Sequence, residues 1–284
     1  MTDFLIYDVF SKEAFGGNQL AIIPDASLLP EDDLQCIARE FNFSESTFVF
    51  PPENPAHTAR VRIFTPTMEI PFAGHPVIGT AVALADAGQS GGMVLELGVG
   101  PLKCFAEDGQ ARFTTEVPLE IIAHPEALEA STALGLRVDD IKTDVHGPVL
   151  ASLGLPFTIS ELASRDALSR ITCDVAAFRV GAVKYPAALD FAQFVYVREG
   201  DVVHARMFAP LDNIPEDPAT GSACATLGAL LCQITGDDQA LSIRQGEAMG
   251  RLSLIELSTQ QSDLGTSVTI SGAAKRVMQG RLIY

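Results

Sequence analysis

Three short stretches of the sequence contain polar side chains that could perform acid–base chemistry. In the first, Glu45 lies within residues 43–50 (FSESTFVF), where an extended chain would place it on one face with Phe43, Thr47 and Val49. A carboxylate among aromatic and β-branched neighbours is partly desolvated, which raises its pKa and suits it to general acid or base work. The alternative is an ordinary surface glutamate at a strand edge, solvated by the serines beside it.

The second stretch, Gly74-His75-Pro76, has the residue types of a helix start. Pro76 would stand where no amide donor is needed, and Gly74 allows close approach of another group to the backbone. The free amides of such a start can hold a carboxylate or a developing enolate, and His75 could relay a proton or donate a hydrogen bond. The alternative is a glycine that only caps a buried helix.

The third stretch, residues 216–223 (EDPATGSA), combines acidic, hydroxyl and amide groups. Asp217 is a candidate second acid or base, while Ser222 could bind substrate or cap the helix that follows. The G-x-S-x-G pattern of serine hydrolases is absent, so Ser222 is not proposed as a nucleophile. Gly98-Val99-Gly100 lacks the third glycine of a dinucleotide-binding fingerprint and no Walker motif occurs, so the sequence predicts no cofactor.

The composition argues against several other classes of function. The 284 residues carry a formal net charge of −17, which disfavours nucleic acid and anionic membranes as partners. The five cysteines and five histidines lack the spacing of a zinc site, so no metal is predicted. No secretory signal or apolar run of roughly 18 residues is found, which leads us to expect a cytoplasmic protein. A small carboxylate substrate would need local positive potential, which helix N-termini provide.

The chain also contains an internal repeat. Residues 62–66 (RIFTP) have a counterpart in residues 206–210 (RMFAP), and each copy follows alternating residues typical of a strand. Each is followed by a proline-containing loop and then by a small-residue helix that begins at Gly74 or Gly221. Aligning the two glycines places His75 opposite Ser222. The order of strand, turn, glycine and helix is thus repeated, which indicates two similar domains.

Both predicted central helices are apolar on all sides, so each should be surrounded by other structure. The sequence therefore predicts an α+β fold of two similar domains, each a curled mixed sheet or barrel wrapped around a central apolar helix. Amphipathic surface helices are expected at residues 29–41 and 125–136, with the boundary near residues 118–124. The two glycine-led helix starts are candidates to face one another across a cleft between the domains.

Taken together, these stretches resemble the PhzF family of phenazine-biosynthesis-like isomerases, relatives of diaminopimelate epimerase. The resemblance covers essentially the whole chain, and its two glycine motifs are specific when they occur in this order. The segments that carry it are residues 15–21 (FGGNQLA), 44–47 (SEST), 64–66 (FTP) with 71–76 (PFAGHP), 216–223 (EDPATGSA), and 245–246 with 249–251.

The resemblance implies a diaminopimelate epimerase-like fold whose last strand returns to the first domain. The domains would then comprise residues 1–118 plus 274–284, and residues 122–273. It implies an active site between the domains and, as a further expectation, a homodimer. The site residues that it implies are Glu45 as the catalytic acid/base, His75 and Asp217 as assisting groups, Gly74 and Gly221 as helix-start amides, and Ser222, Thr220 and Asn18 as further substrate-binding residues.

The epimerase relatives carry a cysteine before each of the two glycines, where this chain has Ala73 and Thr220. Two-thiol racemisation is therefore not available, and Glu45 is the carboxylate that the family pattern offers instead. The sequence thus predicts a cofactor-independent isomerase that moves a proton on a small carboxylate-bearing metabolite. The alternatives are a racemase or epimerase of an amino-acid-like acid, and a family member that only binds a small ligand or a protein. Cys224, inside the second helix, is predicted to be a core residue.

Overall fold

The structure is a computed structural model that describes residues 1–263 and 265–284, and the chain forms two compact units. The first unit comprises Met1–Thr115 and Thr269–Tyr284, and the second comprises Glu116–Val268. The sequence predicts that the chain returns to the first domain at residue 274. In the structure, the boundary between the second unit and the last segment of the first lies between Val268 and Thr269. This boundary falls inside the continuous strand β17 (Gly265–Leu282), where no turn residue marks it in the sequence.

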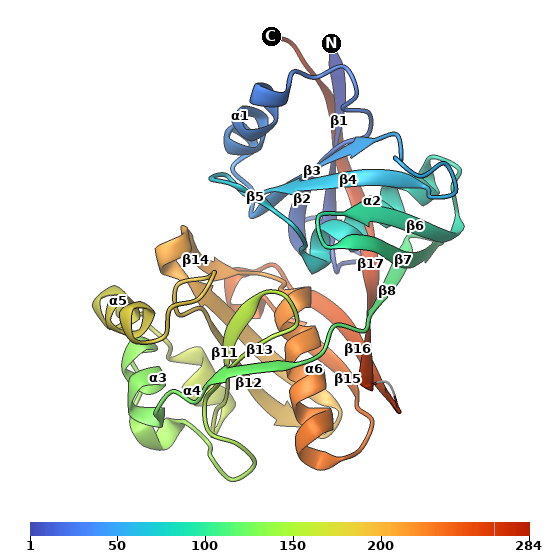
Figure 1. Cartoon of the computed structure of the whole chain (residues 1–284). Helices are drawn as coiled ribbons and strands as arrows, with labels where there is room; N and C mark the ends of the chain where they lie inside the picture. Colours follow the sequence, from blue (N-terminus) through green and yellow to red (C-terminus); the bar gives the residue numbers. More distant parts are fainter. Residues whose placement is uncertain (264) are drawn as a thin grey trace. The chain divides into compact units, whose positions relative to one another are not determined.

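The first unit is a mixed sheet that closes around helix α2, since β8 pairs with β17 and β17 with β1 (Figure 1). The helix packs against strands from both sides of this closure: β1, β2 and β3, and β7 and β8. Besides β17, the elements of the unit are β1 (Thr2–Val9), β2 (Asn18–Ile23), α1 (Glu31–Phe41), β3 (Glu45–Phe50), β4 (Ala59–Phe64), β5 (Glu69–Ile70), α2 (Gly74–Asp86), β6 (Gly91–Leu97), β7 (Gly100–Glu107) and β8 (Gln110–Thr115).

The second unit places helix α6 against strands β10, β11 and β16 of its own mixed sheet (Figure 1). A separate group of short helices packs α3 against α5. The elements are β9 (Glu120–Ala123), α3 (Ala127–Ala133), η1 (Val138–Asp140), β10 (Val149–Ser152), β11 (Pro156–Glu161), α4 (Arg165–Ser169), α5 (Val175–Lys184), β12 (Gln193–Glu199), β13 (Val202–Ala209), η2 (Pro210–Asp212), β14 (Ile214–Asp217), α6 (Gly221–Thr235), β15 (Ala240–Gln245), η3 (Glu247–Met249) and β16 (Ser253–Ser262).

The internal repeat is confirmed in the strand pairing of the two units. In the first, β4 pairs antiparallel with β3 and β5 and parallel with β6. In the second, β13 pairs antiparallel with β12 and β14 and parallel with β15. The same arginine fork recurs on this scaffold: Arg62 binds both oxygens of Glu69, and Arg206 binds both oxygens of Glu216. Such bidentate pairs fix the short β5 and β14 strands against the longer ones.

The two central helices are buried along most of their length, as their apolar composition predicts. Residues 74–83 of α2 and 221–232 of α6 are buried. Each helix has a glycine where a sheet side chain approaches it. A Cβ on Gly79 would lie 2.5 Å from Leu20 Cδ2, and one on Gly228 would lie 2.7 Å from Leu257 Cδ1. None of the helices among the described residues is long and apolar enough to cross a membrane.

The amphipathic pattern of residues 29–41 corresponds to α1. Pro30 is the N-cap, because its ψ of 142° is extended and the helix begins at Glu31. Leu34, Ile37 and Ala38 are buried on one face. The second predicted surface helix, residues 125–136, is the shorter α3.

Candidate active site

The first group of predicted site residues lies where three elements of the first unit begin. Asn18 opens β2, Glu45 opens β3, and His75 is the second residue of α2. Strands β2 and β3 run parallel with Leu20 opposite Glu45, so both begin at the same edge of the sheet. We call Asn18, Glu45 and His75 the Glu45 cluster.

His75 is the centre of this cluster. Its Nε2 lies 3.5 Å from Glu45 Oε2, and its Nδ1 lies 3.4 Å from Asn18 Nδ2. The ring is only 3% exposed, and Nε2 has no hydrogen bond partner among the described residues. The structure therefore brings together three residues that are separated by up to 57 positions in the sequence.

Burial keeps the imidazole of His75 neutral. Desolvation lowers its pKa from 6.5 to about 3, and a hydrogen bond to the backbone carbonyl of Gln19 acts weakly in the other direction. The 3.5 Å contact with Glu45 would become an ion pair only if the ring were protonated. That distance is too long for a strong hydrogen bond. Near neutral pH, His75 is therefore an uncharged ring beside the carboxyl group of Glu45.

Glu45 is held at the end of a strand that packs on α2. Its side chain is 14% exposed, and it shares a strand face with Thr47 and Val49, as predicted. Thr80 of α2 donates a hydrogen bond to Thr47 with an oxygen–oxygen distance of 3.1 Å, and both residues are fully buried. This bond fixes the register of β3 against the helix. The side chain of Glu45 is thus largely, but not completely, removed from solvent at the start of β3.

Phe43 does not belong to that face, contrary to the sequence prediction. The strand begins at Glu45, and the ring of Phe43 stacks on that of Phe41, the last residue of α1, with 6.0 Å between their centroids. A left-handed residue, Asn42 (φ 54°), separates the helix from this segment. The strand therefore begins two residues later than the sequence predicts.

The N-terminus of α2 presents backbone amides without a side-chain cap. Its N-cap is Ala73, which has no cap hydrogen bond, and its first turn contains no acidic residue. The amides of a helix start carry a positive partial charge that suits an anionic group. The start of α2, at Gly74, therefore has the charge to accept an anionic group.

The second group of predicted residues surrounds the start of α6 in the second unit. Thr220 Oγ1 donates to Asp217 Oδ2 at 2.6 Å, and both side chains are buried. Because this hydroxyl is turned toward Asp217, Thr220 is the N-cap of α6 without making a cap hydrogen bond. Ser222 is the second helical residue and is 8% exposed, so it is not the cap residue of α6.

Gln245 completes this second group, and sequence reasoning assigned it no role. Its Nε2 donates to the Asp217 carbonyl oxygen at 2.8 Å and to Thr220 Oγ1 at 2.9 Å. Its Oε1 accepts from the Thr220 amide at 3.1 Å, and the residue is fully buried. Gln245 begins one of the segments that carry the family resemblance, and this is the feature of the sequence that could have identified it as a site residue. We call Asp217, Thr220 and Gln245 the Asp217 cluster.

Possible metal ligands and cysteine thiols are the other groups of this chain that could support chemistry. In the described part of the chain, no three His, Cys, Asp or Glu side chains are grouped so that they could hold a metal ion. Cys224 is fully buried in α6, where desolvation raises the pKa of its thiol. A raised pKa keeps a thiol protonated and unreactive, so Cys224 is a core residue, as predicted. Cys36, by contrast, is exposed, so the cysteines are not all core residues.

Comparison with known proteins identifies the family. The model of the phenazine biosynthesis-like protein family, PhzC-PhzF, matches residues 7–280. The chain belongs to this family. It is 39% identical to an uncharacterized isomerase of Mesorhizobium japonicum, over 99% of this chain and 98% of that protein. It is 32% identical to trans-2,3-dihydro-3-hydroxyanthranilate isomerase of Pseudomonas aeruginosa, over 99% of both chains.

Two solved structures show the same fold. A PhzF family protein of Bacillus anthracis covers 100% of this chain and 99% of its own, with a TM-score of 0.87 and 23% identity. A probable proline racemase of Agrobacterium radiobacter covers 100% of this chain and 93% of its own, with a TM-score of 0.62 and 12% identity, which shows likeness of fold alone. The chain is thus a PhzF-like isomerase with the predicted diaminopimelate epimerase-like α+β fold.

Proposed function

We propose that this isomerase moves a proton within a small unsaturated carboxylate, with Glu45 as the group that removes and returns the proton and with no cofactor. The observation that carries the proposal is the position of Glu45. Its side chain is 14% exposed and lies 3.5 Å from a buried, neutral imidazole at the uncapped start of α2. A carboxylate that water reaches only in part is a stronger base than one in bulk solvent.

In the proposed step, the Glu45 carboxylate removes a proton from a carbon next to a conjugated system. The electron pair of the C–H bond shifts into that system, and the substrate carboxyl group or its conjugated oxygen takes up negative charge. The protonated Glu45 then returns the proton to another carbon of the same system, so that atoms and charge balance. The amides at the start of α2, beginning at Gly74, are proposed to hold the anionic group.

His75 is proposed to position Glu45 and not to carry the proton. A ring with a pKa of about 3 is a much weaker base than a carboxylate, so it does not compete with Glu45 for the substrate proton. The ring donates to the backbone carbonyl of Gln19, and Nε2 has no hydrogen bond partner among the described residues, so the ring proton lies on Nδ1. Nε2 then faces the Glu45 carboxyl group as an acceptor, and His75 is proposed to orient the protonated form of Glu45.

The trans-2,3-dihydro-3-hydroxyanthranilate isomerases of Pseudomonas aeruginosa and Pseudomonas fluorescens, 32% and 33% identical to this chain, suggest the kind of substrate. We propose an unsaturated, cyclic amino or hydroxy carboxylate. The departure from the two-cysteine epimerases, Ala73 and Thr220, supports transfer between two carbons over inversion at one.

The test is incubation of wild-type protein with a panel of such carboxylates in deuterated water, followed by mass spectrometry and NMR. We expect deuterium at a new carbon position with wild type and none above background with Glu45→Gln. Glu40→Gln, an exposed glutamate of α1, serves as the matched control and should behave like wild type. Equal uptake by Glu45→Gln and wild type would remove Glu45 from this role. Deuterium at the original carbon with inverted configuration would identify an epimerase instead.

A further inference from the structure

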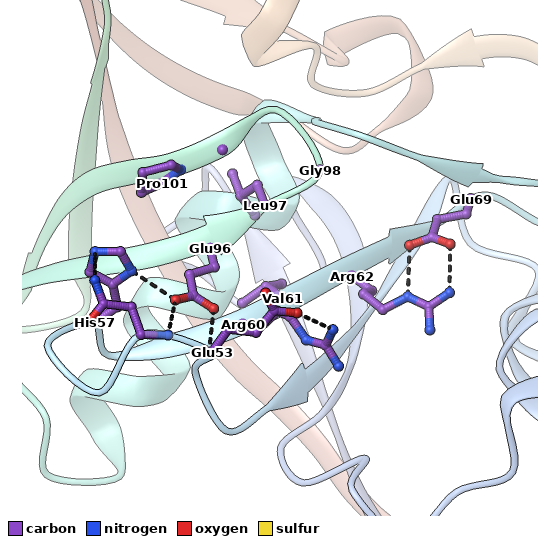
Figure 2. A pocket seen from close by; sticks show the side chains of 12 residues that line it. Glu53, His57, Arg60, Val61, Arg62, Glu69, Glu96, Leu97, Gly98 and Pro101 are labelled. Atoms are coloured by element: carbon purple, nitrogen blue, oxygen red, sulfur yellow. Dashed lines mark hydrogen bonds and ion pairs between the residues drawn. The ribbon is translucent and has the colours of Figure 1, made fainter.

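A pocket of about 460 Å³ opens on the first unit between β4 and the β6–β7 turn (Figure 2). It contains no residue of the Glu45 cluster. Its charged lining residues are Glu53, Arg60, Arg62, Glu69 and Glu96, accompanied by His57 and Asn54.

The pocket exists because a parallel strand pair ends early. Strand β4 pairs with β6 only at Ala59 and Arg60, opposite Leu95 and Glu96. The matching pair in the second unit, β13 with β15, continues over four residues. Beyond Arg60 the strands of the first unit diverge, and Gly98 packs on Pro71 so closely that a Cβ there would lie 2.7 Å from Pro71 Cα.

One wall of the pocket is built around the carboxylate of Glu96. It accepts hydrogen bonds from the amides of Glu53 and Asn54 at 2.7 and 2.8 Å, and His57 Nδ1 lies 2.8 Å from it. The amide of Asn54, followed by that of Glu53, lowers the pKa of Glu96. On the opposite wall, Arg62 is engaged with both oxygens of Glu69, as Figure 2 shows. Charges of both signs are thus fixed before any ligand arrives.

Arg60 and Glu53 keep bonding capacity for a ligand. Arg60 donates from Nη1 to Glu53 Oε1 at 2.8 Å. Its Nε is buried and has no hydrogen bond partner among the described residues, so a ligand would bind the terminal Nη groups. A guanidinium has five N–H donors, four of them on the Nη atoms, so most of those that a ligand can reach are not used by Glu53. The Glu53 side chain is 74% exposed and can turn toward a new partner at little cost.

We propose that this pocket binds a small zwitterion that carries both a carboxylate and an ammonium group. Its carboxylate would pair with Arg60, and its ammonium group with Glu53 and Glu69. The lining holds three carboxylates and two guanidinium groups, so a ligand of one sign would meet like charge on either wall. A zwitterion can pair its carboxylate with a guanidinium group and its ammonium group with a carboxylate. The volume of the pocket is within the range of small-ligand sites.

Calorimetric titration of the full chain tests this site without any reaction. The probes are glycine, 4-aminobutyrate and 6-aminohexanoate, compared with butyrate and butylamine, which keep one charge each. We expect at least one zwitterion to bind ten-fold or more tightly than both singly charged probes, with NMR shifts at the Gly98 and Gly100 amides. Equal affinities for all probes, or no binding by any zwitterion, would overturn the proposal.

Four variants locate the site. Arg60→Lys and Glu53→Gln should each weaken the zwitterion ten-fold or more. Arg112→Lys is the matched control, because Arg112 also stacks on a phenylalanine of this unit, as Arg60 does, but lies outside the pocket. It should bind like wild type, and so should Glu45→Gln. Loss of binding in Glu45→Gln would place the probe at the Glu45 cluster and reject the pocket, whereas the proposed isomerisation is tested separately by deuterium uptake.

Discussion

The two units share a scaffold but carry different chemistry at matching positions. Phe64 and Phe208 are equivalent in the repeat, and they pair with Ser46 and Gln193 respectively. The residue before Gln193 is Ala192, so the position of Glu45 is occupied by alanine in the second unit. The first unit therefore has a carboxylate where the second has none.

The converse holds for the Asp217 cluster. Ile63 and Met207 are equivalent, and they pair with Ile70 and Asp217, so an apolar residue stands in the first unit where the second has an acid. Gln245 pairs with Ala205, and the equivalent place in the first unit falls at Leu97, beyond the last pair of β4 with β6. The repeat supplies the sheet and central helix twice, whereas each acid–base cluster occurs once.

This asymmetry suggests different roles for the two clusters and not two copies of one role. A symmetric pair of thiols can exchange one proton across a single carbon, whereas unlike groups suit a transfer between two different positions.

The largest difference is expected when each acid is removed in turn. Glu45→Gln should lower the rate of deuterium exchange about 10³-fold, in the range for loss of a general base. If both acids serve one proton transfer, Asp217→Asn should also lower the rate of deuterium exchange. The double variant should then be no slower than the slower of the two single variants. Multiplying effects in the double variant, measured with a substrate found in the panel, would show two independent roles.

The second prediction replaces Gln245 by the residue type at its counterpart, giving Gln245→Leu. Leucine keeps the volume but leaves the Asp217 carbonyl and the Thr220 amide without their buried partners. We expect a loss of about 3 kcal/mol in the free energy of unfolding, since each unpaired buried group costs ~1–3 kcal/mol. Urea denaturation measures this loss, with Gln279→Leu on the exposed part of β17 as control. A change as small as that of the control would mean that the network contributes little.

The third prediction compares the close contacts of the two central helices. Gly79→Ala would press on both Leu20 and Val9, with contacts of 2.5 and 2.7 Å, whereas Gly228→Ala would press on Leu257 alone. Overpacking of this kind costs ~1–3 kcal/mol, and we expect about 2 kcal/mol for Gly79→Ala and less for Gly228→Ala. Gly92→Ala, with nothing within 4 Å of its Cβ, provides the baseline. Thermal unfolding measures these losses. A larger loss of stability in Gly228→Ala than in Gly79→Ala would show that Leu20 and Val9 move aside more easily than Leu257.

The sequence identified the elements that depend on local pattern. Apolar residues on every side of two segments predicted the buried helices, and the matching RIFTP and RMFAP segments predicted the repeated sheet. The family resemblance named Glu45, His75 and Asn18 as candidate residues, and Gly74 marked the start of the helix that carries His75. The arrangement of His75 between Asn18 and Glu45 depends on the parallel pairing of β2 with β3, which no local pattern specifies.

Other features could not be predicted because they arise from distant contacts. Gln245 bonds to residues 25 and 28 positions away, and a glutamine in an alternating strand gives no sign of which polar groups it will meet. The pocket depends on where the pairing of β4 with β6 stops, and this is decided by the contact of Gly98 with Pro71. Phe43 was misplaced because its neighbours alternate like a strand, although Asn42 and the ring of Phe41 hold it beside α1.

The last prediction concerns pH and separates His75 from its counterpart Ser222, which does not titrate in this range. The pKa of His75 is about 3 in the folded chain and about 6.5 when unfolded, so between these values the unfolded state binds one more proton. The contribution of this residue to the free energy of unfolding is therefore fully present above pH 6.5. It is lost as the pH falls toward 3, by about 1 kcal/mol per pH unit. His75→Gln removes the titrating ring, so its stability should fall less steeply than that of wild type between pH 6.5 and 4.5. Because Glu45 faces the ring in both proteins, the difference between the two slopes measured by urea denaturation isolates His75, and parallel slopes would mean that the ring is protonated in the folded state.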